Sequence, residues 1–167
     1  MSTTTTPGQQ AGTGTPAGID PRGPQFAAAL TSVVLIVVLL LAPSPAGTAL
    51  LAVQAVLFAL GAARGVQRTP YSWLFRTLVR PRLSAPTELE DPAPPRFAQT
   101  VGLVFALVGL AGFLTGVDAV GLVATGFALV AALLNAIFRF CLGCEMYLLF
   151  KRATTHPDPA APAAQER

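Results

Sequence analysis

The chain has 167 residues, of which 53% are hydrophobic and only 11% are charged. This composition is typical of proteins with long apolar membrane segments and argues against a soluble domain. The formal net charge is +3, but no basic stretch interleaved with aromatic residues occurs, so we expect no nucleic-acid partner.

The two ends of the chain differ from its middle in composition. Residues 1–18 and 153–167 are rich in Thr, Pro, Gly, Ala and Gln. Such segments bury too little apolar surface to offset the entropy lost on folding. We therefore predict a disordered tail at each end and one membrane domain over residues 19–152.

Four apolar runs without charged residues dominate this domain. They cover residues 26–42, 46–63, 97–115 and 119–138. Each is close to the roughly 17 to 25 residues that a helix needs to cross a bilayer. The predicted fold class is therefore all-α, an integral membrane protein with four transmembrane helices.

A cleaved signal peptide is the alternative interpretation of the first run. The small residues at positions 45–47 loosely resemble a cleavage site. Against this, a long polar leader precedes the run, and only Arg22 supplies a basic flank. We therefore predict that the first run is retained as a helix.

Short breaks join the runs in pairs. Residues 43–45 carry two prolines, which cannot continue a helix, and residues 116–118 separate the last two runs. Connections this short favour antiparallel neighbours. We therefore predict two hairpins, with residues 64–96 between them.

The basic residues predict the orientation of these hairpins. They all lie before the first run, within residues 64–96, or after the fourth run, and neither short turn carries one. Basic residues in short loops stay on the cytoplasmic side of the membrane. We therefore expect a multi-pass plasma-membrane protein with both termini in the cytoplasm.

The segment between the hairpins has its own pattern. In residues 70–80, apolar side chains fall on one helical face, and Arg76 and Arg80 fall on another. This predicts a short helix in the membrane interface, where Trp73 is favoured and the arginines meet anionic head groups. A helix that docks a protein partner is the alternative. Residues 81–95 are rich in proline, so we expect an extended connection there.

Small residues repeat every fourth position in three of the runs, for example at Ala124, Ala128 and Ala132. Such stripes let helix backbones approach closely in lipid. Packing within the chain is one interpretation, and a homo-oligomer is the other. Gln54 lies midway along the second run, where it predicts a hydrogen bond to another helix, with Thr31 and Ser32 as candidate partners.

The candidate chemistry lies just beyond the fourth run, where the chain has its only two cysteines, Cys141 and Cys144. The Cys-x-x-Cys spacing suits a reversible dithiol and disulfide couple, because one thiolate can attack a mixed disulfide formed at the other. A cytoplasmic location argues against a permanent structural bridge. Arg139 favours a thiolate by its charge and Glu145 opposes it, so these four residues form the predicted catalytic site.

Other uses of the cysteines stay open. Two thiolates do not complete a tetrahedral zinc site, although a soft monovalent copper ion can bind two sulfurs. Glu145 stands where haem attachment requires histidine, so that use is excluded, and we predict no cofactor. Two buried cysteines that pack as small hydrophobes are a further interpretation.

Hairpin topology predicts which residues support the cysteines. The third run begins on the side where the fourth one ends, so Arg96 and Gln99 are expected near Asn135. No ionisable residue lies inside the four runs, and this argues against a proton-coupled carrier.

Four stretches together resemble one protein family, and these are residues 20–23, 79–83, 95–99 and 140–148. Over residues 19–152 the chain is similar to an uncharacterised, mainly actinobacterial four-helix membrane family of unknown function with a Cys-Leu-Gly-Cys-Glu motif. The resemblance carries the family motif onto Cys141, Gly143, Cys144, Glu145, Arg96, Phe97 and Gln99. It also implies sulfur or thiol chemistry with a cytoplasmic thioredoxin-like protein or sulfurtransferase, because such genes tend to lie beside the family's own.

Three functions follow as hypotheses. The first is a membrane-bound dithiol that exchanges electrons or sulfane sulfur with such a partner. The second is a small transporter or channel for a sulfur compound or a soft metal ion, which the scarcity of polar residues in the runs weakens. The third is a structural anchor that presents Arg76 and Arg80 to a partner. Whether the protein is an enzyme is left open.

Overall fold

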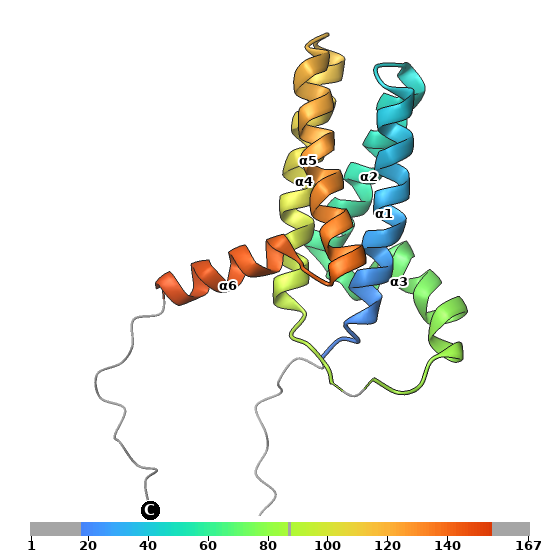
Figure 1. Cartoon of the computed structure of the whole chain (residues 1–167), viewed down its shortest axis with the longest axis vertical. Helices are drawn as coiled ribbons and strands as arrows, with labels where there is room; N and C mark the ends of the chain where they lie inside the picture. The colour runs from blue at the N-terminus through green and yellow to red at the C-terminus, as the bar shows by residue number, and fades with distance from the viewer. Residues whose placement is uncertain (1–17, 87, 155–167) are drawn as a thin grey trace, which may run out of the picture.

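Four long helices form the body of the molecule, in a computed structural model that describes residues 18–86 and 88–154 (Figure 1). They are α1 (Arg22–Leu41), α2 (Pro45–Arg64), α4 (Ala93–Leu114) and α5 (Asp118–Phe138). All four are long and apolar enough to cross a membrane. The prediction of an all-helical protein with four such helices is therefore confirmed.

Short helical turns and one further helix complete the fold. Between α2 and α4 lie η1 (Val66–Arg68), α3 (Pro70–Leu74), η2 (Phe75–Val79) and η3 (Arg80–Arg82), and α6 (Leu142–Thr154) follows α5. The two predicted tails lie almost entirely outside the described residues. We call residues 65–92 the connector, because they join α2 to α4.

Prolines mark where two of the long helices begin. Pro45 is the first residue of α2, and the hydroxyl oxygen of Ser44 accepts a hydrogen bond of 3.2 Å from the backbone N–H of Gly47. Pro94 lies in the first turn of α4, which therefore begins four residues before the apolar run. Proline is well tolerated there, since the first helical N–H groups have no intrahelical partner.

The long helices pack around a small core. α1 contacts α2 and α5, while α4 contacts α2 and α5, so the four form a closed ring of neighbours. Leu35, Leu51 and Ala106 are fully buried inside this ring. Outside it, large apolar side chains such as Leu40 (78% exposed) and Leu114 (74% exposed) have no protein cover. An outer surface of this kind fits a lipid bilayer.

Glycine sets the closest helix contact. A Cβ on Gly112 would overlap the backbone nitrogen of Gly121, and a Cβ on Gly109 would lie 3.0 Å from Oγ1 of Thr125. Only small residues allow two helix backbones to approach this far. α4 and α5 are therefore held together along their sides as well as by the short link between them.

The connector differs from the single interfacial helix expected over residues 70–80. Its backbone changes from the α-helical turns of α3 to the π-helical turn of η2, where the N–H of Arg80 bonds to the carbonyl of Phe75. Pro81 has no N–H to continue the helix. Phe75 is buried and lies 5.8 Å from the ring of Phe26, whereas Leu78 is 52% exposed. The expected apolar face is thus divided, since Phe75 packs on α1 and Leu78 points outward.

Candidate functional site

The end of α5 turns the chain toward the cysteines. Arg139 has a left-handed backbone with φ of 57°. Its N–H bonds to the carbonyl of Asn135 at 3.1 Å, and the N–H of Phe140 bonds to the carbonyl of Leu134 at 3.3 Å. A left-handed residue is a common way to end a helix, although glycine is the usual choice. This turn places Cys141 directly before α6.

Cys141 and Cys144 form a disulfide across the first turn of α6, with their Cα atoms 5.1 Å apart. The sulfur of Cys141 also accepts a hydrogen bond of 3.3 Å from the backbone N–H of Cys144. Both residues are half-buried. The pair is therefore in its oxidised form, which is one of the two states expected of a reversible couple.

Two contacts seat the first turns of α6 on α4. Gly143 is buried, and a Cβ there would lie 2.7 Å from both Cα and Cβ of Ala98. One turn later, the rings of Tyr147 and Phe97 have centroids 5.8 Å apart. The disulfide is thus fixed beside the first half of α4.

A cavity of about 910 Å³ opens beside the disulfide. Its walls come from all four long helices, the first turns of α6 and the connector, with α2 contributing Phe58. Part of the lining is apolar, from the buried Phe58 to Phe127, which is 60% exposed, and toward the disulfide it includes Gln25 and Asn135. The volume falls in the range of roughly 300 to 1,000 Å³ that is usual for small-molecule sites.

Most of the predicted site residues line this one cavity. They are Cys141, Cys144, Glu145, Arg139, Gln99 and Asn135. Arg139 and Glu145 are exposed, whereas Gln99 and Asn135 are half-buried. The lining combines a disulfide, the three amides of Gln25, Gln99 and Asn135, and charges of both signs.

Arg96 belongs to α4, but its side chain does not line the cavity and lies instead against the C-terminal end of α2. Its guanidinium donates hydrogen bonds of 2.6 Å and 2.9 Å to the carbonyls of Ala62 and Ala63. These carbonyls belong to the last turn of α2, where intrahelical donors are lacking and positive charge is favoured. Arg96 therefore supports the bundle rather than lining the cavity.

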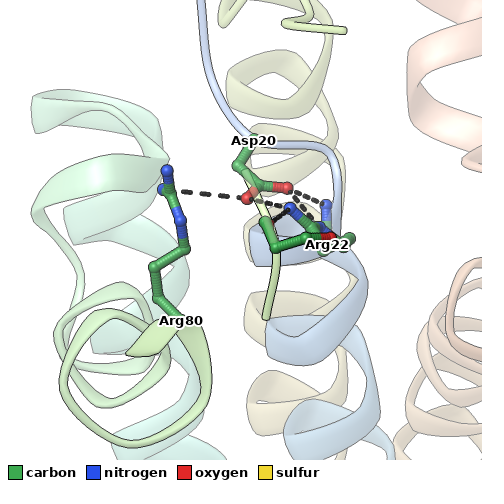
Figure 2. Close-up of polar contacts among 4 residues, drawn as sticks. Asp20, Arg22 and Arg80 are labelled. Atoms are coloured by element: carbon green, nitrogen blue, oxygen red, sulfur yellow. Dashed lines mark hydrogen bonds and ion pairs between the residues drawn. The ribbon is translucent and has the colours of Figure 1, made fainter. Parts of the chain in front are cut away.

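The connector residues that were expected to contact lipid or a partner are divided between two environments. Trp73 is 60% exposed, and Arg76 is exposed as well. Arg80 instead forms an ion pair with Asp20, with 3.7 Å between Nη1 and Oδ2 (Figure 2). Its charge is directed toward the protein.

Asp20 is the centre of this polar cluster. Its carboxylate accepts the backbone N–H of Arg22 at 3.1 Å and the Nε and Nη2 donors of the same residue at 3.0 Å and 3.1 Å (Figure 2). Burial alone would raise the pKa of Asp20. The hydrogen bonds from Arg22 and the charges of Arg22 and Arg80 outweigh burial, so this pKa lies below its usual value.

The same cluster holds the connector against the start of α1. Arg22 donates a hydrogen bond of 3.0 Å to the carbonyl of Ser84. Next to it, Ile19 and Glu90 exchange two backbone hydrogen bonds of 2.8 Å and 2.9 Å. Ser84 and Glu90 also line the cavity, so these bonds fix one of its walls.

One polar contact was not anticipated from the sequence, and the predicted hydrogen bond of Gln54 to another helix has a different partner from those expected. Nε2 of Gln25 donates a hydrogen bond of 3.0 Å to the carbonyl of Ala136, which links α1 to the end of α5. Gln54 accepts a hydrogen bond from the Tyr71 hydroxyl, whereas Ser32, one of its expected partners, bonds to the carbonyl of Ala28. The signal for Gln25 was its position as a polar residue directly before an apolar run.

Among the residues that the structure describes, no three His, Cys, Asp or Glu side chains come together in an arrangement that could hold a metal ion. The Cys141–Cys144 disulfide is a bond of a kind that exchanges with thiols without a metal.

Comparison with protein families gives one match. The family described as a domain of unknown function, DUF4395, matches residues 19–152. Comparisons with curated proteins and with solved structures gave no significant match.

Proposed function

Since this chain belongs to the DUF4395 family, we propose that it is a membrane-bound thiol protein whose Cys141–Cys144 pair cycles between dithiol and disulfide. Its partner is a cytoplasmic thioredoxin-like protein or a sulfurtransferase. The observation that supports this proposal is the position of the disulfide, half-buried and beside a cavity large enough for a small molecule or a short segment of a partner.

The reaction begins from the reduced pair. One cysteine thiolate attacks a disulfide sulfur of the partner, forms a mixed disulfide and releases one partner thiolate. The second cysteine then attacks the mixed disulfide, closes the Cys141–Cys144 bond and releases the other partner thiolate. The pair loses two electrons and the partner gains two.

Sulfane sulfur follows the same route. A cysteine thiolate takes the outer sulfur of a partner persulfide and releases the partner thiolate. The second cysteine attacks the inner sulfur of the resulting cysteine persulfide, closes the disulfide and releases hydrosulfide. Both versions end with the oxidised pair, and a reduced dithiol protein of the thioredoxin-like class returns two electrons to it by the same exchange, becoming oxidised itself.

Cys141 is the better candidate for the attacking residue. Its sulfur already accepts the N–H of Cys144 and lies at the start of α6. Hydrogen bonding and the positive end of a helix both favour a thiolate. Glu145, in the first turn of α6, opposes it by its negative charge.

The proposal includes an orientation. The four helices form two antiparallel hairpins in the plasma membrane, and the connector, the cysteines and both termini lie on the cytoplasmic side. The positions of the arginines support this orientation, and the exposed Trp73 and Arg76 suit an interfacial connector.

Two experiments test the proposal. In cells, Cys144→Ser is expected to trap the partner on Cys141 as a mixed disulfide, and Cys141→Ser is expected to trap less. A membrane-impermeant maleimide is expected to label the pair in inverted vesicles after reduction, but not in intact cells. Labelling from outside would overturn the orientation, and reactive thiols that trap nothing in either single variant would overturn the exchange reaction.

A small carrier for a sulfur compound is the second candidate. The cavity beside the disulfide supports it, because the cavity extends from the cysteines to Phe58, which is buried in the bundle. This function predicts uptake of the compound into vesicles that is lost in both single cysteine variants.

A further inference from the structure

α6 presents three different faces along its 13 residues. One face packs on α4 through Gly143 and Tyr147, as described above. A second face is apolar and exposed, with Leu142 (43%), Met146 (47%), Leu149 (63%) and Phe150 (67%). These positions follow the i, i+4, i+7, i+8 spacing of one side of a helix.

The third face of α6 is polar. Glu145, Lys151 and Arg152 fall on the sides of the helix away from Phe150, and both basic residues lie in the last turn. On the part of α6 that α4 does not cover, the more exposed apolar side chains and the charged ones therefore fall on different sides of the helix, with Leu148 (38% exposed) as the exception.

α6 also differs from the other helices in direction. It leaves the bundle sideways, across the long axis of α1 and α5, and only its first turns touch α4 (Figure 1). At 13 residues it is too short to cross a bilayer, which needs about 20 residues. A helix in this position runs along a membrane surface if the four long helices span that membrane.

We infer that α6 is a membrane-surface helix whose apolar face, Leu142, Met146, Leu149 and Phe150, lies in the lipid of the same bilayer that the bundle crosses. Lipid is the occupant because the four long helices, which also expose large apolar side chains, are apolar enough to cross a bilayer, and α6 leaves them sideways (Figure 1). Lys151 and Arg152 at the end of α6 suit anionic head groups. The bilayer thereby holds the Cys141–Cys144 pair at the level of its own surface.

The inference is tested with tryptophan fluorescence of the full chain in vesicles of three parts phosphatidylcholine to one part phosphatidylglycerol, with bromine on the acyl chains. Trp73 is the only tryptophan, so Trp73→Phe gives a silent background. Phe150→Trp reports the apolar face of α6, and Lys151→Trp is the matched reporter outside that face, about 100° further round the helix. Leu40→Trp, on the outside of α1, reports insertion of the bundle.

Bromine is expected to quench Phe150→Trp nearly as strongly as Leu40→Trp, and at least twofold more than Lys151→Trp. Equal quenching at positions 150 and 151, with Leu40→Trp still quenched, would overturn the inference. A protein partner or a second copy on this face would give that second result. The experiment reads no thiol chemistry, so its outcome is independent of the proposed exchange reaction.

Discussion

The hydroxyl of Tyr71 donates a hydrogen bond of 2.9 Å to Oε1 of Gln54, an amide that is 1% exposed and lies midway along α2. A residue of the connector thus reaches an amide inside the bundle. Burial also raises the pKa of Tyr71, so the phenol remains a hydrogen-bond donor at neutral pH. The contact joins two parts of the chain that sequence periodicity would assign to different environments.

Tyr71→Phe is therefore expected to destabilise the protein. The change leaves Oε1 of Gln54 buried without this donor, and the unmet group costs about 1 to 3 kcal/mol. Unfolding in mixed detergent micelles measures the decrease in the free energy of unfolding. Tyr147→Phe is the control, since it keeps the ring that contacts Phe97. Equal stability of Tyr71→Phe and the parent chain would contradict the role of the contact.

Asp20→Asn is expected to lower stability at neutral pH and to matter less in acid. The pKa of Asp20 is depressed in the folded protein relative to its usual 3.8. A carboxyl group whose pKa is lower in the folded state than in the unfolded state stabilises the fold at any pH above its unfolded pKa. This stabilisation is lost as the pH falls through the folded pKa. The difference in stability between the parent and Asp20→Asn should therefore become smaller below about pH 4. A pH series of thermal unfolding measures this, and a gap that stays constant in acid would count against the ion cluster.

Gly143→Ala is expected to lift α6 from α4. The added methyl group would lie 2.7 Å from Ala98, and overpacking of this kind costs about 1 to 3 kcal/mol. Gly126→Ala is the matched control, because a Cβ at that helical glycine has no neighbour within 4 Å. Stability and the rate of maleimide labelling after reduction are the readouts. If the two alanine variants behave alike, the close approach of α6 and α4 is wrong.

Arg96→Gln is expected to cost about 1 kcal/mol, because the last carbonyls of α2 lose two charged donors. Arg96→Lys keeps the charge but not the two-pronged geometry, so it should restore only part of the loss. Unfolding of both variants beside the parent measures this order. A lysine variant less stable than the glutamine variant would be inconsistent with capping by charge.

The four long helices could be predicted from the sequence because an uncharged apolar run of this length has few alternatives. α6 was missed because it mixes charged and apolar residues and follows directly on the end of α5. Its signal was present in the spacing of Leu142, Met146, Leu149 and Phe150. The cysteine motif and this helical spacing overlap in the same stretch of sequence, and the motif alone was interpreted.

Contacts between distant segments could not be predicted in the same way. Asp20 and Arg80 both lie in stretches that carry the family resemblance, yet their ion pair depends on how the connector folds back over α1. The proximity of Cys141 and Cys144 followed from their spacing, whereas their bonded state did not. Gln99 and Asn135 line the same cavity, as the hairpin topology suggested, but Arg96 turns toward α2 because the open carbonyls there accept its donors.

The capping of α2 by Arg96 has a consequence for the order in which the protein is made. The carbonyls of Ala62 and Ala63 accept hydrogen bonds from Arg96, which lies 34 and 33 positions further along the chain. A growing chain completes α2 before Arg96 has been added. Those carbonyls must then be hydrated, because an unpaired backbone group is too costly in hydrocarbon. The end of α2 is thus obliged to stay at the aqueous surface at least until Arg96 follows it in the growing chain.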